Sequence, residues 1–267
     1  MKVLIGIGDS WTAGVGGIPD HERDVDYPNN NDYFYRYGEE LTKIPKFISK
    51  ELTSSWVNKL ASKLNVIPIN LGVSGSGNRG SVKSLYLNDI EWDNIDGGYM
   101  IHMLSARIRF DLFDHNIEQS QKNHCRLYNT ICLPDEMDSL ESYKKHAWWF
   151  ENIHTESIAN NETILSILEA QHVAKLKNLK FYFCFSFEDC SDLMCNDNLS
   201  SKINWDQCIT KNTSFLRILA DLQNTPHDIG HYFQLTDSTE YISKCGHPTD
   251  KGYSYIADYI FNQMIKL

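Results

Sequence analysis

The sequence predicts an α/β fold: a three-layer α/β/α sandwich around a mostly parallel central sheet. Short apolar runs rich in β-branched residues are typical of buried strands, and between them lie segments with helical spacing of apolar residues. Strands that alternate with helices imply parallel pairing with helices on both faces of the sheet. At 267 residues, the chain is long enough for one large domain with a substantial core, so we expect a single domain over residues 1–267.

The first predicted strand, residues 3–7, is bounded by glycine and holds three β-branched residues. The other predicted strands are similar short apolar runs at residues 66–71, 98–104 and 179–185.

Helices are predicted where apolar residues recur every three or four positions. Between residues 54 and 64, Trp56, Leu60 and Leu64 share one face, and Ser54 or Ser55 can cap the amino end. The clearest helix spans about residues 161–177. The other expected helices begin near residue 81, cover residues 215–219 and include residues 256–264.

Three segments, at about 18–50, 112–160 and 187–213, read as insertions. Loops over the carboxyl ends of strands often form lids or substrate walls, although surface excursions with packed tyrosines fit the first segment equally well. The pairs Tyr33/Tyr35 and Trp148/Trp149 could stack on a sugar ring; buried aromatic packing is the alternative.

The net charge of −10 argues against general binding to nucleic acids or anionic membranes. The apolar stretches are shorter than a membrane span, and the amino terminus does not resemble a signal peptide, so a protein that is cytoplasmic or carried in a phage particle is expected. The seven cysteines favour buried free thiols, with a metal site at Cys184, Cys190 and Cys195 as a weak alternative. No metal and no cofactor are expected.

The tripeptide Gly8-Asp9-Ser10 follows the first predicted strand directly, and in an open α/β sheet the sites form at the carboxyl ends of the strands. A dinucleotide fingerprint would need a third glycine where Trp11 stands, and the Gly-Lys-Ser/Thr ending of a P-loop is absent. Ser10 is therefore a candidate nucleophile, and an ordinary turn with a surface serine is the alternative.

Two further stretches complete a pattern: residues 70–75, which follow the second strand, and Gly246-His247-Pro248, which precedes the last helix. With Gly8-Asp9-Ser10 they resemble, in order, three blocks of the SGNH (GDSL-type) hydrolase superfamily. The resemblance implies a flavodoxin-like sheet, with Ser10 as nucleophile and His247 as catalytic base. It also implies that the backbone N–H groups of Ser10 and Gly75 stabilise the oxyanion.

The third block departs from the family, which has an asparagine as oxyanion donor after the third strand. Here that strand ends in Ser105, followed by Arg109, a form that resembles a subgroup common among phage and polysaccharide-locus proteins. Ser105 and Asn78 are the candidate side-chain donors to the oxyanion. Arg109 could contact an anionic substrate or pair with a carboxylate such as Asp111.

The triad acid is the second departure, because Lys244 stands three residues before His247, where the family has aspartate. A lysine cannot accept the imidazole Nδ1–H. The acid could instead be Asp237 or Glu240, a backbone carbonyl could serve in a Ser-His dyad, or the chain could be a relic that binds without efficient turnover.

The function expected from these features is that of a serine esterase, most plausibly an O-acetyl esterase acting on a carbohydrate through an acyl-enzyme on Ser10. Its partner would be a small acylated or carbohydrate substrate, and the sequence leaves the oligomeric state open. A non-catalytic binding or structural module on the same fold, for example in a phage particle, is the second hypothesis. A lipase or thioesterase ranks third, and the Gly-X-Ser-X-Gly elbow of α/β-hydrolases is absent from the sequence.

Overall fold

The computed structural model describes residues 1–17, 53–73, 76–88, 90–107, 155–194 and 198–266. Within these residues, four strands form one parallel sheet in the order β2-β1-β3-β4: β1 (Val3–Gly8), β2 (Ile67–Gly72), β3 (Gly98–Leu104) and β4 (Leu179–Phe185). All four predicted strands are confirmed to within one residue at each end. Because the strands are parallel, their carboxyl ends share one edge of the sheet, and β1 lies in the interior of that edge.

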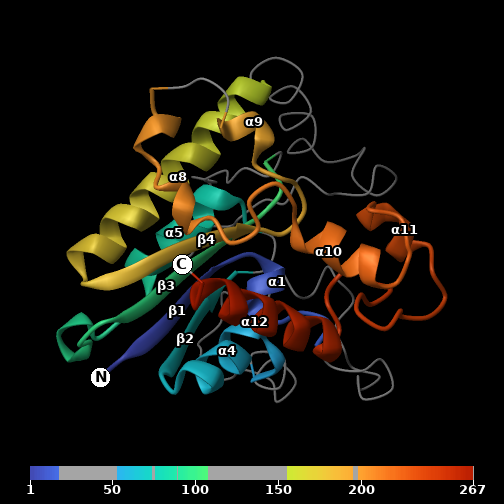
Figure 1. Ribbon diagram of the computed structural model, residues 1–267, viewed down its shortest axis with the longest axis horizontal. Helices are drawn as coiled ribbons and strands as arrows, with labels where there is room; N and C mark the ends of the chain where they lie inside the picture. Colours follow the sequence, from blue (N-terminus) through green and yellow to red (C-terminus); the bar gives the residue numbers. More distant parts are fainter. Residues whose placement is uncertain (18–52, 74–75, 89, 108–154, 195–197, 267) are drawn as a thin grey trace, which may run out of the picture.

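Helices cover both faces of the sheet, as the three-layer prediction requires (Figure 1). On one face α5 (Asn78–Leu87) packs beside α8 (Glu156–Leu176), and on the other α4 (Trp56–Leu64) packs beside α12 (Asp250–Met264). Alternate residues of β1, β3 and β4 supply two separate apolar cores: Ile5 belongs to the α5/α8 side, and Leu4 belongs to the α4/α12 side.

The predicted helices are present, and several begin earlier than their apolar spacing indicated. Ser55 caps α4 as expected, while α8, capped by Thr155, begins at Glu156, five residues before residue 161. The remaining helices of the described residues are α1 (Ser10–Ala13), α9 (Ser191–Met194), α10 (Phe215–Leu222), α11 (Ile229–Phe233) and three 3-10 turns at Trp92–Asn94, Ser200–Lys202 and Trp205–Gln207.

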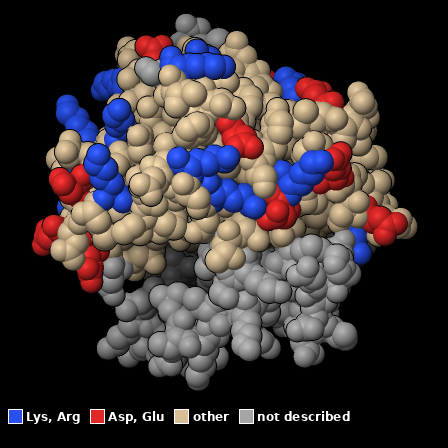
Figure 2. Space-filling view, turned by 60° about the horizontal axis from the view of Figure 1, so that its bottom comes forward, with Lys and Arg blue, Asp and Glu red and all other residues tan. Residues whose placement is uncertain are grey.

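The predicted insertions at 18–50 and 112–160 lie outside the described residues, apart from the start of α8. The third, 187–213, is mostly irregular with short helical turns, as the sequence indicated. No helix among the described residues has the length and apolar character needed to cross a membrane. On the face seen in Figure 2, basic and acidic side chains lie interspersed.

Candidate active site

Ser10 lies at the junction of β1 and α1, held there by the residue before it. Asp9 is fully buried and caps α1 by accepting a 3.0 Å hydrogen bond from the Trp11 N–H at its Oδ1. Ser10 is the first residue of α1, so its own N–H has no acceptor within the helix. This placement directs a backbone donor and a hydroxyl to the same edge of the sheet.

The end of β2 approaches this junction through a glycine. A side chain at Gly72, the last residue of β2, would place its Cβ 2.3 Å from the backbone nitrogen of Ala13. The absence of a side chain therefore lets the end of β2 pack directly against α1. Gly75, the expected backbone donor after β2, lies outside the described residues.

His247 reaches Ser10 from the loop before α12. Gly16, with φ of +89°, lies against it: a Cβ at Gly16 would be 2.7 Å from the Cβ of His247. The Tyr253 hydroxyl of α12 donates a 2.8 Å hydrogen bond to the carbonyl of Val15. These contacts hold the segment after α1 against the start of α12, and they position His247 beside Ser10.

The result is a direct contact between two residues 237 positions apart: His247 Nε2 lies 2.9 Å from Ser10 Oγ. Ser10 is 4% exposed, and His247 is half-buried. A serine hydroxyl bonded to an imidazole at this distance is the arrangement that activates a nucleophile by general-base catalysis.

The other ring nitrogen of His247 contacts a thiol. Its Nδ1 lies 3.3 Å from Sγ of Cys245, a residue that no sequence motif singled out. Lys244, at the usual acid position, is exposed, and its backbone N–H donates to Ser238 Oγ.

The two carboxylates proposed as triad acid lie elsewhere. The Glu240 carboxylate forms an ion pair with Lys251 of α12. The carboxylate of Asp237 accepts a 3.4 Å hydrogen bond from the hydroxyl of its neighbour Thr236. The structure therefore does not bring either side chain to Nδ1 of His247, where Cys245 lies instead.

The proposed side-chain oxyanion donors, Ser105 and Asn78, are both buried at the carboxyl end of β3 and have other partners. The Ser105 hydroxyl donates to Oδ2 of Asp9 at 2.8 Å, and its backbone N–H donates to Oδ1 of Asn78 at 2.7 Å. The Asn78 amide group in turn donates to Thr163 Oγ1 at 3.1 Å and to the Ser105 carbonyl at 3.4 Å. In this structure the Ser105 hydroxyl joins the end of β3 to the junction of β1 and α1, and the Asn78 amide hydrogens join α5 to α8 and to the end of β3.

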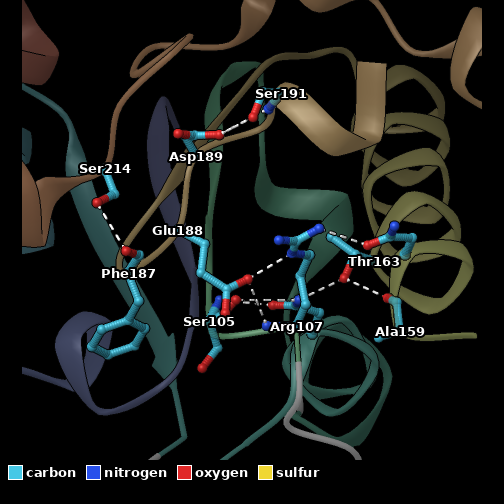
Figure 3. Close-up of polar contacts among 11 residues, drawn as sticks. Ser105, Arg107, Ala159, Thr163, Phe187, Glu188, Asp189, Ser191 and Ser214 are labelled. Atoms are coloured by element: carbon cyan, nitrogen blue, oxygen red, sulfur yellow. Dashed lines mark hydrogen bonds and ion pairs between the residues drawn. The ribbon is translucent and has the colours of Figure 1, made fainter. Parts of the chain in front are cut away.

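Arg109, the expected substrate contact, lies outside the described residues, but Arg107 occupies the same strand end. Its Nε donates to Glu188 Oε2 at 2.6 Å, and its Nη1 donates to Asn160 Oδ1 at 2.8 Å (Figure 3). Because the Glu188 carboxylate also accepts from the Arg107 backbone N–H, the guanidinium is held in one orientation.

Arg107 and Glu188 form part of a pocket of about 280 Å³ beyond the ends of β3 and β4. Its other lining residues are Phe187, Asp189, Ser191, Ser214, Arg217 and His227. Phe187 connects this pocket to the nucleophile, because its ring packs edge-on against Trp11 with centroids 5.0 Å apart. Hydrogen bonds from Ser191 hold the pKa of Asp189 below its usual range, so this wall keeps its negative charge.

His102 is a fully buried residue of β3, and its ring nitrogens have no hydrogen-bond partner within the described part of the chain. Burial lowers the pKa of His102 to about 3. Cys184 and Cys190 are buried free thiols, and Cys195 lies outside the described residues. Among the described residues, no group of three His, Cys, Asp or Glu side chains could hold a metal ion.

Comparison with known proteins gives weak likenesses of overall shape. No protein-family model and no curated protein matches the sequence. A solved structure from Desulfitobacterium hafniense, described as lipolytic and of the G-D-S-L family, has a TM-score of 0.43 at 10% identity, covering 98% of this chain and 99% of its own.

Two carbohydrate-active structures are similar at the same level. One is an acetyl xylan esterase from the rumen bacterium Butyrivibrio proteoclasticus; the other is a carbohydrate esterase whose active site is described as having divergent catalytic and non-catalytic binding functions. Each has a TM-score of 0.45 at 11% identity, and the match covers 100% of this chain but 65% of theirs. At these identities and TM-scores, the likenesses do not decide what the site does.

Proposed function

We propose that this protein is a serine ester hydrolase in which Ser10 is the nucleophile and His247 is the general base. The observation that carries the proposal is the 2.9 Å contact between Ser10 Oγ and His247 Nε2. Its support is the agreement of this contact with the roles that the SGNH resemblance implies for the same two residues.

In the proposed reaction, Ser10 Oγ attacks the ester carbonyl carbon while His247 Nε2 takes the hydroxyl proton. The carbonyl π electrons move to the oxygen, and the Ser10 N–H stabilises the resulting oxyanion. Collapse of this intermediate breaks the bond to the alcohol, which leaves with the proton from Nε2. Water, deprotonated by His247, then attacks the acyl-enzyme and releases the acid and free Ser10.

The substrate class that we propose is an O-acetylated carbohydrate. The pocket beside Arg107 is lined by charged and hydroxyl side chains and one phenyl ring, Phe187, which suit hydrogen bonding and stacking to a sugar. A long acyl chain would need an apolar groove, so the polar lining disfavours a lipase. The contact of Phe187 with Trp11 of α1, the helix that begins at Ser10, supports a substrate site beside the proposed nucleophile.

Turnover measurements test the proposal directly. Hydrolysis of p-nitrophenyl acetate and release of acetate from acetylated glycans are compared for the wild type and for Ser10→Ala. We expect activity in the wild type and its loss in the variant. Equal activity in both proteins would reject the assignment of Ser10.

The thiol of Cys245 beside His247 Nδ1, together with the separate contacts of the Glu240 and Asp237 carboxylates, favours a second candidate, a binding module on the same fold. Such a protein would bind glycans with unchanged affinity after Ser10→Ala. It would hydrolyse neither p-nitrophenyl acetate nor acetylated glycans. Isothermal titration with deacetylated and acetylated glycans separates this candidate from the esterase.

A further inference from the structure

The ring of His247 contacts a hydroxyl at one nitrogen and a thiol at the other. Its Nδ1 lies 3.3 Å from Cys245 Sγ, and that sulfur lies 2.9 Å from the hydroxyl oxygen of Ser243. Ser243 is buried, and its hydroxyl and its backbone N–H both donate to the carbonyl of His247, at 2.9 and 2.7 Å. The three residues therefore form a closed chain of hydrogen bonds around the turn that carries His247.

This chain fixes where the protons lie. The Ser243 hydroxyl proton is directed to the His247 carbonyl, so the oxygen meets Cys245 as an acceptor, and the thiol proton points to it. The sulfur then presents its lone pairs to Nδ1, which must donate. A proton on Nδ1 leaves Nε2 of the neutral imidazole unprotonated and facing the Ser10 hydroxyl, as a general base requires.

We propose that Cys245 is the residue that orients His247, taking the place beside Nδ1 that a carboxylate fills in the Ser-His-Asp arrangement. The inference rests on the proposed function of Ser10 and His247. Cys245 acts as a positioning residue: it remains a neutral thiol and selects the productive tautomer by accepting the Nδ1–H. It does not receive the Ser10 proton, which stays on Nε2 until the alcohol leaves.

The local backbone explains why the residue two positions before the histidine takes this place. Gly246 has φ of +74°, and its N–H donates to the Ser243 carbonyl at 2.9 Å. A side chain there would place its Cβ 2.9 Å from carbon atoms of Ile229 and Phe233. The tight turn brings Cys245 beside the ring and leaves Lys244 exposed.

Three substitutions at this position test the proposal, with Cys184→Ala, a buried thiol in β4, as the matched control. For Cys245→Ala we expect kcat to fall about 2- to 12-fold, the factor carried by one ordinary hydrogen bond, with KM nearly unchanged. Cys245→Ser retains an acceptor and is expected to recover part of this loss. Cys245→Asp should also shift the acid limb of the kcat/KM profile to higher pH, because a carboxylate beside the ring favours imidazolium.

A spectroscopic readout separates this inference from the proposed function. ¹⁵N NMR of the imidazole, assigned with His247→Gln, should show the Nδ1–H tautomer in the wild type and a larger Nε2–H population in Cys245→Ala. An unchanged tautomer together with an unchanged kcat in Cys245→Ala would overturn the role of Cys245, even if Ser10 proves essential. Absence of Ser10-dependent turnover would reject the esterase, but the change of tautomer in Cys245→Ala would still report the contact between Cys245 and His247. If Cys245→Ala does not fold, the pH profile of Cys245→Asp decides whether the residue at this position acts on the His247 ring.

Discussion

The Ser105 hydroxyl donates a 2.8 Å hydrogen bond to Oδ2 of Asp9, and both side chains are buried. This bond joins the carboxyl end of β3 to the residue that immediately precedes Ser10. A buried carboxylate is stable only with hydrogen-bond donors around it, so Ser105 supports the turn that carries the nucleophile.

Substitution Ser105→Ala removes this donor from Asp9. We expect the free energy of unfolding to fall by about 1–3 kcal/mol, the cost of withdrawing a partner from a buried polar group. Urea denaturation measures the change, and Ser62→Ala, which removes an exposed hydroxyl bonded to Asn58 in α4, is the control. A loss no larger than that of the control would show that the bond does not stabilise the turn.

Substitution Asn78→Ala distinguishes a structural amide from an oxyanion donor. Loss of an oxyanion donor slows turnover by about 10²–10³-fold. Because the Asn78 amide already serves Ser105 and Thr163, we expect a loss of stability of about 1–3 kcal/mol and a less than about 10-fold fall in turnover rate. Urea denaturation and steady-state kinetics measure the two effects. A roughly 10²-fold slower turnover with unchanged stability would show instead that Asn78 donates a hydrogen bond to the oxyanion.

The buried His102 should make the free energy of unfolding depend on pH. Its pKa is about 3 in the folded protein and about 6.5 in the unfolded chain, so only the unfolded chain binds this proton at intermediate pH. The contribution is fully present above pH 6.5 and is lost as pH falls toward 3, at no more than about 1.4 kcal/mol per pH unit. In His102→Leu this part of the acid dependence should disappear, whereas substitution of the exposed His172 by Gln should leave it intact. Denaturation curves between pH 7 and 4 measure the slope, and equal slopes in wild type and His102→Leu would contradict the prediction.

Arg217 tests whether the polar pocket binds substrate. Its guanidinium lines the pocket 3.7 Å from Asp189, and the side chain is 48% exposed, so Arg217→Ala should fold normally. We expect KM to rise several-fold for acetylated glycans. KM should stay unchanged for p-nitrophenyl acetate, because this molecule is too small to reach from Ser10 into the pocket that Arg217 lines. Arg79→Ala, which removes two similar partly exposed ion pairs between α5 and α8, provides the comparison. An equal effect of both substitutions would place sugar binding elsewhere.

The parallel sheet could be predicted from sequence because β1, β3 and β4 are short apolar runs that are largely buried on both faces. The edge strand β2 is also a short apolar run, although its first two residues are exposed. The first residues of helices were harder to predict from sequence: α8 begins directly after its capping residue Thr155 rather than at its first apolar repeat. The five residues of α11 are too few to show helical periodicity.

The site was predicted in part. Local motifs singled out Ser10 and His247, which the fold brings to 2.9 Å. Cys245 escaped notice because only the turn at Gly246 places it beside the ring, and no spacing rule indicates such a turn. The hydrogens of Ser105 and Asn78 are taken by contacts between β1, β3, α5 and α8, which depend on the packed structure.

The most direct test of Ser10 as an activated nucleophile is covalent labelling by a fluorophosphonate, followed by mass spectrometry of the peptide that contains it. We expect the wild type to gain one phosphonyl group on Ser10, His247→Gln to react far more slowly, and Ser10→Ala to remain unlabelled. An unlabelled wild type that is folded, or labelling that persists in Ser10→Ala, would contradict the proposed function.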